Sequence, residues 1–174
     1  MIFNSQSGLI QLASRTREAD WAQWYFEHLR IMATVPGVFS AQRFTTTHPG
    51  HPPSLAMYGV ASADVFKGDY YQSVRGMGEW LPLIDRQWYR RNLFDGLDSA
   101  PFVNDDQVLL VADRDTPDAA LPLPCTWLKV AGIDCSTPYR GIAVVNNNGA
   151  QSLPENVAIY TTASKRYVNT REET

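Results

Sequence analysis

The sequence predicts a mixed α+β fold, in which helices and antiparallel strands alternate along the first half of the chain. Residues 17–34 place aromatic and apolar side chains at helical spacing, and the pattern stops before Pro36 and Gly37. Residues 38–46 then alternate as a strand does, and a second alternating run, 54–61, follows across a loop rich in Pro and Gly. Two strands joined by so short a loop pair antiparallel, so these three elements are the starting point of the predicted fold.

The predicted helix presents one aromatic stripe and one polar face. The stripe consists of Trp21, Trp24, Tyr25, His28 and Met32. The opposite side gathers Asp20, Gln23, Glu27 and Arg30. A helix buries its apolar stripe against the rest of the protein. An ionisable ring, His28, is therefore aimed at the layer on which this helix packs.

The elements on either side complete a recurring order. Residues 8–13 alternate and predict the first strand, ahead of the helix. Ser62 or Asp64 can cap a second helix that runs to about Val74, and residues 88–94 predict a fourth strand. The resulting order, β-α-β-β-α-β, is that of a ferredoxin-like unit, which we assign to residues 1–98.

The C-terminal part, residues 99–174, is predicted to be a β-rich extension packed on the same domain. Its four expected strands span residues 107–112, 127–133, 140–145 and 157–161. A four-stranded sheet with both helices on one face leaves its other face bare, and a second sheet from a partner subunit is the commonest cover. We therefore expect a homodimer. The extension could lengthen the sheet, wrap the partner or close one end of the cavity.

Composition excludes several classes of protein. Hydrophobic residues make up 44% and charged residues 19%, so a sizeable core is expected. The net charge is -3 and no run of like charges is present, which argues against nucleic acid as a partner. No apolar run approaches the roughly 20 residues that span a membrane, and the N-terminus lacks a signal-peptide pattern. Cys125 and Cys135 have no metal-type neighbours and are expected to be reduced thiols in a cytoplasmic protein.

Several residue types recur in an order that resembles a known family. They are Trp24-Tyr25, His28, Pro36-Gly37, Arg43-Phe44, Leu55 and Tyr58. Over residues 8–95 this pattern is similar to the EthD-type branch of the dimeric α+β barrel superfamily. The resemblance implies a homodimer of ferredoxin-like units with a ligand cavity between sheet and helices. It also carries over His28 as an acid or base. Glu27 matches the acidic residue that often precedes this histidine, whereas residues 29–31 depart from the family's polar residues.

Each candidate site residue has a functional and a structural interpretation. His28 could be a general base, because its ordinary pKa near 6.5 allows either charge state at neutral pH, or a core histidine satisfied by one hydrogen bond. Arg43 could bind a substrate carboxylate or phenolate, or form an interface or surface ion pair. Tyr58 could donate a hydrogen bond to substrate or simply fill the core. Trp24 and Tyr25 are expected to shape the pocket.

The remaining chemistry-bearing residues give weaker signals. His48 and His51 lie three apart in a loop, but a metal site needs further ligands, so a solvated loop is favoured and no metal is predicted. Asp134 and Arg140 are expected to pair across adjacent strands in a structural role. No phosphate-binding glycine loop, nucleophile elbow or zinc motif is present, so no cofactor is predicted.

These observations favour a cytoplasmic, cofactor-independent enzyme that acts on a small aromatic or conjugated compound, in a degradative pathway. His28 would move a proton in an elimination (lyase), isomerisation, cyclisation or oxygenation (monooxygenase) reaction. Two alternatives stay open: a non-catalytic binding protein for an aromatic ligand, and a haem-handling barrel protein. Neither nucleic acid nor a membrane is an expected partner.

Overall fold

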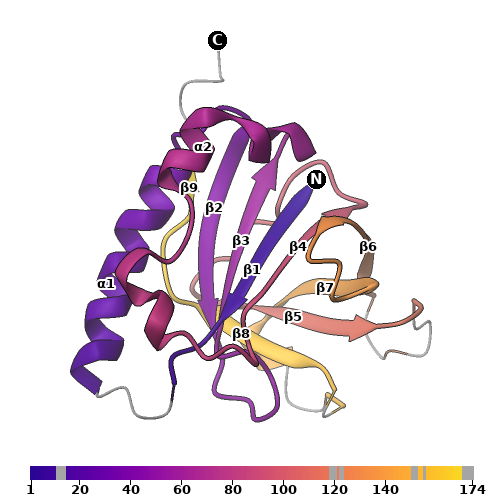
Figure 1. Cartoon of the computed structure of the whole chain (residues 1–174). Helices are drawn as coiled ribbons and strands as arrows, with labels where there is room; N and C mark the ends of the chain where they lie inside the picture. Colours follow the sequence, from indigo (N-terminus) through magenta and orange to yellow (C-terminus); the bar gives the residue numbers. More distant parts are fainter. Residues whose placement is uncertain (11–14, 118–120, 122–123, 150–152, 155, 170–174) are drawn as a thin grey trace.

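Antiparallel strands dominate the computed structural model, which describes residues 1–10, 15–117, 121, 124–149, 153–154 and 156–169 (Figure 1). The strands are β1 (Ile2–Ser7), β2 (Val38–Thr45), β3 (Ser54–Val60), β4 (Arg90–Asp95), β5 (Gln107–Arg114), β6 (Thr126–Ile133), β7 (Tyr139–Asn146), β8 (Ala158–Thr162) and the short β9 (Tyr167–Val168). The helices are α1 (Arg15–Met32) and α2 (Asp69–Val74), with single-turn 3₁₀ segments η1 (Ala63–Lys67), η2 (Gly78–Leu83) and η3 (Asn147–Gly149). The mixed α+β class is therefore confirmed.

Eight of the described strands close into a barrel within one chain. Their order is β3-β1-β4-β6-β7-β5-β8-β2, and a pairing between β2 and β3 closes the ring. Each neighbouring pair is antiparallel. The joint between β8 and β2 is narrow, with Phe44 opposite Thr162 and Thr45 opposite Thr161. Beyond it, β9 pairs with β2 at Ser40.

This closure answers a question that the sequence left open. Strands β1 to β4 were expected to need a partner subunit to cover their bare face. Strands β5 to β8 of the same chain provide that cover, and a shared apolar interior forms between the two halves. The interior is filled by Ile2, Phe44, Leu55, Met57, Phe94, Leu109, Val111, Leu128, Ile142 and Tyr160. The extension thus closes the barrel, while the division at residue 98 and the homodimer stay predictions.

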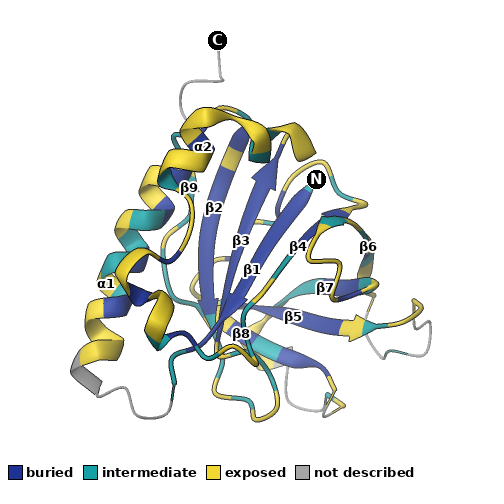
Figure 2. Ribbon diagram, in the orientation of Figure 1, coloured by how far each residue is buried: buried dark blue, intermediate teal, exposed yellow. Residues whose placement is uncertain are grey.

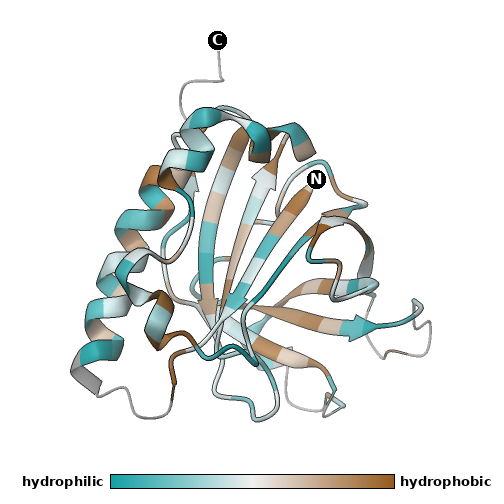
Figure 3. Cartoon of the chain, viewed as in Figure 1, coloured by the Kyte–Doolittle hydropathy of each residue, from teal (hydrophilic) through white to brown (hydrophobic). Residues whose placement is uncertain are grey.

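The first strand was placed too late in the chain. It was expected at residues 8–13, but β1 is Ile2–Ser7; of the expected span, Leu9 forms only an isolated bridge to Ile84, and residues 11–13 lie outside the described part. The sequence of β1 reads IFNSQS, and hydrophilic residues interrupt it (Figure 3). All six of its residues are nevertheless buried, because β1 is central, with β3 on one side and β4 on the other. Hydropathy alone therefore misses a strand whose polar side chains bond inside the protein.

The other elements lie close to their predicted positions. Helix α1 ends at Met32, and Gly37 adopts a positive φ of 80° in the turn before β2. Such a backbone conformation favours glycine. The expected second helix is split at Gly68 into η1 and α2, and the Ser62 hydroxyl accepts a hydrogen bond from the Asp64 amide as the cap of η1. No described helix is both long and apolar enough to cross a membrane.

A second core lies between the helices and the sheet. Figure 2 shows buried residues along β1 to β3 and exposed residues on the outer side of α1. Helix α1 buries Trp21, Tyr25, Leu29 and Met32 against Ala41, Ala56, Tyr58 and Val60 of the sheet. The polar residues Asp20, Gln23, Glu27 and Arg30 are exposed, as predicted. This layer, rather than the barrel interior, contains the predicted site residues.

Candidate functional site

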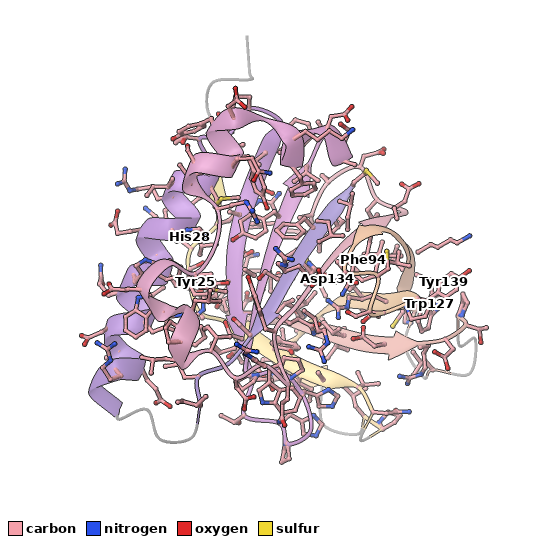
Figure 4. The ribbon with its side chains drawn as sticks, in the orientation of Figure 1. Tyr25, His28, Phe94, Trp127, Asp134 and Tyr139 are labelled. Atoms are coloured by element: carbon pink, nitrogen blue, oxygen red, sulfur yellow. The ribbon has the colours of Figure 1, made fainter. Side chains whose placement is uncertain are left out.

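A small cavity lies between α1, α2 and the sheet. Its volume is about 30 Å³, room for one or two water molecules. Side chains from six segments line it, chiefly Phe3 and Ser5 of β1, Tyr25 and His28 of α1, Tyr58 of β3, Tyr71 of α2, Arg75 of the turn after α2, and Tyr89 just before β4 with Arg91 at its start. In Figure 4, Tyr25 and His28 lie on the side of α1 that faces the sheet, away from Asp134, Trp127 and Tyr139. We call this space the helix–sheet cavity.

His28 enters the helix–sheet cavity from the edge of the buried stripe of α1. Its ring stacks on Trp24, with centroids 4.8 Å apart, and meets Tyr25 edge-on at 6.1 Å. Burial lowers the pKa of His28 to about 4, because the charged imidazolium loses its hydration. The ring is therefore neutral at physiological pH and has a nitrogen able to accept a proton. No hydrogen bond to this ring is found among the described residues.

The phenols around the cavity are proton donors. Burial raises the pKa of Tyr25 and Tyr71 and raises that of Tyr58 well above its usual range. Nearby guanidinium groups, Arg43 for Tyr25 and Arg91 for Tyr71, act in the opposite direction but do not offset the burial. These hydroxyls stay protonated at neutral pH, so they can donate hydrogen bonds to a negative charge that develops in the cavity.

Arg43 lies on the helix-facing side of β2, as predicted, but it does not line the helix–sheet cavity. The guanidinium carbon is 4.7 Å from the ring centroid of Trp21 and 4.5 Å from that of Tyr25. Its Nε donates to Ser54 Oγ at 2.9 Å. The Tyr25 ring thus stands between Arg43 and the cavity, and Arg43 borders a separate groove on the other side.

Arg43 is a buried cation without a carboxylate. Its side chain belongs to a residue that is only 4% exposed, and none of the described acidic residues forms an ion pair with it. The surface ion pair considered for it is therefore not seen among the described residues, and the interface ion pair stays a prediction. Burying an unpaired charge costs several kcal/mol, of which two cation–π contacts return roughly 0.5 to 2 kcal/mol each.

The structure thus brings three of the five predicted site residues together. His28, Tyr25 and Tyr58 line one cavity, Trp24 supports the ring of His28 from behind, and Arg43 is set apart. Sequence reasoning missed Tyr71 and Arg75, and it counted Tyr89 only among the aromatic residues that could line a pocket, without placing it beside His28. It placed Arg90 and Arg91 on a strand without choosing between them; Arg91 faces the helices, whereas Arg90 is exposed. The pairing register decides which of the two arginines faces the helices. Asn92 and Phe94 point into the barrel, and because side chains alternate along a strand, Arg91 points the other way.

A polar cluster inside the barrel was not anticipated. Arg140 is completely buried; it binds both carboxylate oxygens of Asp113 at 2.7 Å and the side-chain oxygens of Asn4 and Gln6 at 2.9 Å. The expected pairing of Arg140 with Asp134 is wrong. Asp134 instead pairs with Arg91 at 3.1 Å, since β7 faces β5 in register and brings Arg140 opposite Asp113.

The histidine loop and the cysteines do not form a metal site. The rings of His48 and His51 stack at 5.1 Å, and no group of three or more His, Cys, Asp or Glu side chains suited to a metal ion occurs among the described residues. Cys125 and Cys135 are both free thiols.

Comparison with known proteins identifies the fold. No family model and no curated protein matches the chain. Among solved structures, a candidate monooxygenase from Lactobacillus acidophilus NCFM is similar, with a TM-score of 0.54 at 9% sequence identity, over 97% of this chain and 96% of the other. A candidate chlorite dismutase, TA0507, has a TM-score of 0.52 at 8% identity, over 92% and 94%. The likeness confirms the expected α+β barrel at the level of the fold, and a fold does not determine a reaction.

Proposed function

We propose that this protein is a small-molecule enzyme in which His28 acts as a general base within the helix–sheet cavity. The observation that carries the proposal is the setting of His28: a neutral imidazole without a hydrogen-bond partner among the described residues faces a cavity lined by phenols and guanidinium groups. His28 is half-buried and its ring nitrogens are not fully buried, so a substrate in the cavity could reach them. The EthD-type resemblance and the two similar α+β barrels support an enzyme of this kind.

The arrangement suits removal of a proton from a small conjugated compound, such as a phenol or an enolisable ketone. His28 would take the proton, and the substrate would become an enolate or phenolate. Protonated Tyr58 and Tyr71 would donate hydrogen bonds to the new negative charge, with Arg91 adding a positive charge nearby. The subsequent step could be elimination, isomerisation, cyclisation or reaction of the carbanion with oxygen.

A substrate requires more room than the cavity has in this structure. Small-molecule sites usually occupy roughly 300 to 1,000 Å³, against about 30 Å³ here. Tyr71 of the six-residue helix α2 and the turn that follows, residues 75–77, line one side of the cavity, and Gly76 in this turn and Gly78 just after it have positive φ angles of 97° and 51°. We propose that this segment moves aside to admit substrate, as active-site lids do.

Haem handling is the weaker alternative. A porphyrin would require a far larger opening of the helix–sheet cavity than a small phenol does, and the ring of His28 lies flat against Trp24. We therefore prefer chemistry on a small substrate to haem handling. Titration with haem should give no shifted Soret band.

The homodimer and the EthD-type assignment remain part of the proposal. The order β1-α1-β2-β3-α2-β4, in which β4, β1, β3 and β2 are neighbours, matches a ferredoxin-like unit. Because this chain closes its own barrel, a dimer would not be needed to cover the sheet. Only the family resemblance supports it.

The test is a comparison of His28→Gln with Glu27→Gln. Glu27 is the adjacent acidic residue, but it points outward and pairs with Arg30 at 2.8 Å. Activity would be screened on small phenols, hydroquinones and enolisable ketones, by absorbance and by oxygen consumption. His28→Gln should lose about 10² to 10⁴-fold of the turnover rate, and Glu27→Gln should lose almost none.

Two outcomes would contradict this proposal. A folded His28→Gln variant that keeps full activity would show that His28 is not the base. Tight retention of an aromatic compound by the wild type, without turnover of any compound in the screen, would favour the binding-protein alternative.

A further inference from the structure

A second concavity lies on the other side of Tyr25 from the helix–sheet cavity. It is bounded by the N-terminal half of α1, by β2 and β3, and by the loop that joins these strands. Its volume is about 420 Å³, within the usual range of small-molecule sites. Leu9, Phe26 and Pro53 give it apolar walls, and Thr45 and Ser54 add hydroxyl groups. We call it the Arg43 groove.

Two hydrogen-bond donors border this groove. The indole Nε1–H of Trp21 is buried and has no acceptor among the described residues, and a buried donor is normally satisfied. The guanidinium of Arg43 makes one side-chain hydrogen bond there, from Nε to Ser54, and its amino groups are open to the groove. The two groups are adjacent, because the Arg43 guanidinium carbon lies 4.7 Å from the ring centroid of Trp21.

The chemistry of these donors selects an acceptor. Arg and the Trp indole can only donate hydrogen bonds, and Arg also carries a permanent positive charge. A carboxylate has two acceptor oxygens and the opposite charge, which makes it the natural partner of a guanidinium. The rings of Trp21 and Tyr25 each contact the Arg43 guanidinium and hold the side chain in place. The Arg43 side chain would therefore need little further ordering when a ligand binds. Glu18 is an exposed residue of the same groove and would oppose an anion modestly.

We propose that the Arg43 groove binds a small monocarboxylic acid, with its carboxylate on Arg43 and Trp21 Nε1–H and its apolar body against Leu9, Phe26 and Pro53. This site is separate from the helix–sheet cavity and does not depend on proton transfer by His28.

The test uses phenylacetate and phenylacetamide as a matched pair of probes. They have nearly the same shape and differ in charge. Binding to the full chain would be followed by the indole N–H resonance of Trp21 and by calorimetry. Phenylacetate should bind at least tenfold more tightly than phenylacetamide and should shift that resonance. Arg43→Gln should weaken phenylacetate binding tenfold or more.

Trp21→Phe is the second variant, because it removes the indole N–H and keeps an aromatic ring. It should weaken phenylacetate binding by roughly 10- to 150-fold, the loss of one hydrogen bond to a charged group. His28→Asn, in the other cavity, should leave the affinity unchanged, and Glu18→Gln should raise it slightly. Equal affinity for the two probes would overturn the proposal. So would phenylacetate binding that Trp21→Phe leaves intact and His28→Asn abolishes, a result that places the acid in the helix–sheet cavity.

Discussion

Two arginines are buried in the described part of the chain, and their surroundings differ completely. Inside the barrel, Arg140 meets Asp113, Asn4 and Gln6, so its guanidinium makes four hydrogen bonds. Between helix and sheet, Arg43 meets two aromatic rings and one hydroxyl. The barrel cluster is complete within the chain, whereas the helix–sheet layer leaves polar groups without partners.

This difference separates a structural role from a functional one. A fully satisfied polar cluster fixes the register of the strands that contribute to it, and Arg140 connects β7 to β5 and β1. A buried group without a partner is costly to keep. Trp21 carries such a group, and the guanidinium of Arg43 makes only one hydrogen bond among the described residues. We therefore propose binding roles for Trp21 and Arg43, a catalytic role for His28 and a structural role for Arg140.

The largest expected effect is on the barrel cluster. Arg140→Met should lower the free energy of unfolding by about 3 to 5 kcal/mol, because Asp113, Asn4 and Gln6 lose their common donor. Urea denaturation would measure it. A loss below about 1 kcal/mol would remove the contrast between the two regions.

The effect of pH on stability through His28 should be intermediate in size. The pKa of His28 is about 4 in the folded protein and near 6.5 in the unfolded chain. As the pH falls below 6.5 the unfolded chain binds the proton first, so stability decreases down to about pH 4 and then levels off. The decrease should reach up to about 3 kcal/mol. The measurement is the free energy of unfolding of wild type minus that of His28→Gln at each pH. The contributions of the other histidines cancel in this difference.

A constant difference between these two proteins from pH 7 to pH 4 would show that His28 is solvated in both states. That result would also weaken its assignment as a neutral base.

The smallest effect is expected at the other arginine. Arg43→Met should change the free energy of unfolding by less than about 1.5 kcal/mol in either direction, because removing an unpaired buried charge offsets the lost ring contacts. Thermal and urea unfolding beside Arg140→Met would measure it. A loss of 3 kcal/mol or more would mean that Arg43 is as much a structural residue as Arg140.

The sequence was informative wherever side chains repeat with a simple period. The stripe on α1, the stop at Pro36 and Gly37, and the alternation along β2 and β3 all have local causes, and the structure follows them. The strand at Ile2–Ser7 was missed because its asparagine and glutamine are residue types usually found at the surface. They are buried here because Arg140, at least 134 residues further along the chain, donates hydrogen bonds to both. The cavity partners of His28 were missed for a similar reason, since Tyr71 and Tyr89 reach it from different elements.

By itself, the sequence determined the helix, its aromatic stripe, the strand pair that follows and the histidine among the aromatic side chains. Those features depend on neighbours within a few residues, which periodicity and turn chemistry record. Only the tertiary structure decided that one chain closes the barrel, that Arg140 pairs with Asp113 instead of Asp134, and that Tyr25 separates Arg43 from His28. Contacts of that kind depend on the pairing of distant strands, and distance along the chain does not record which strands become neighbours.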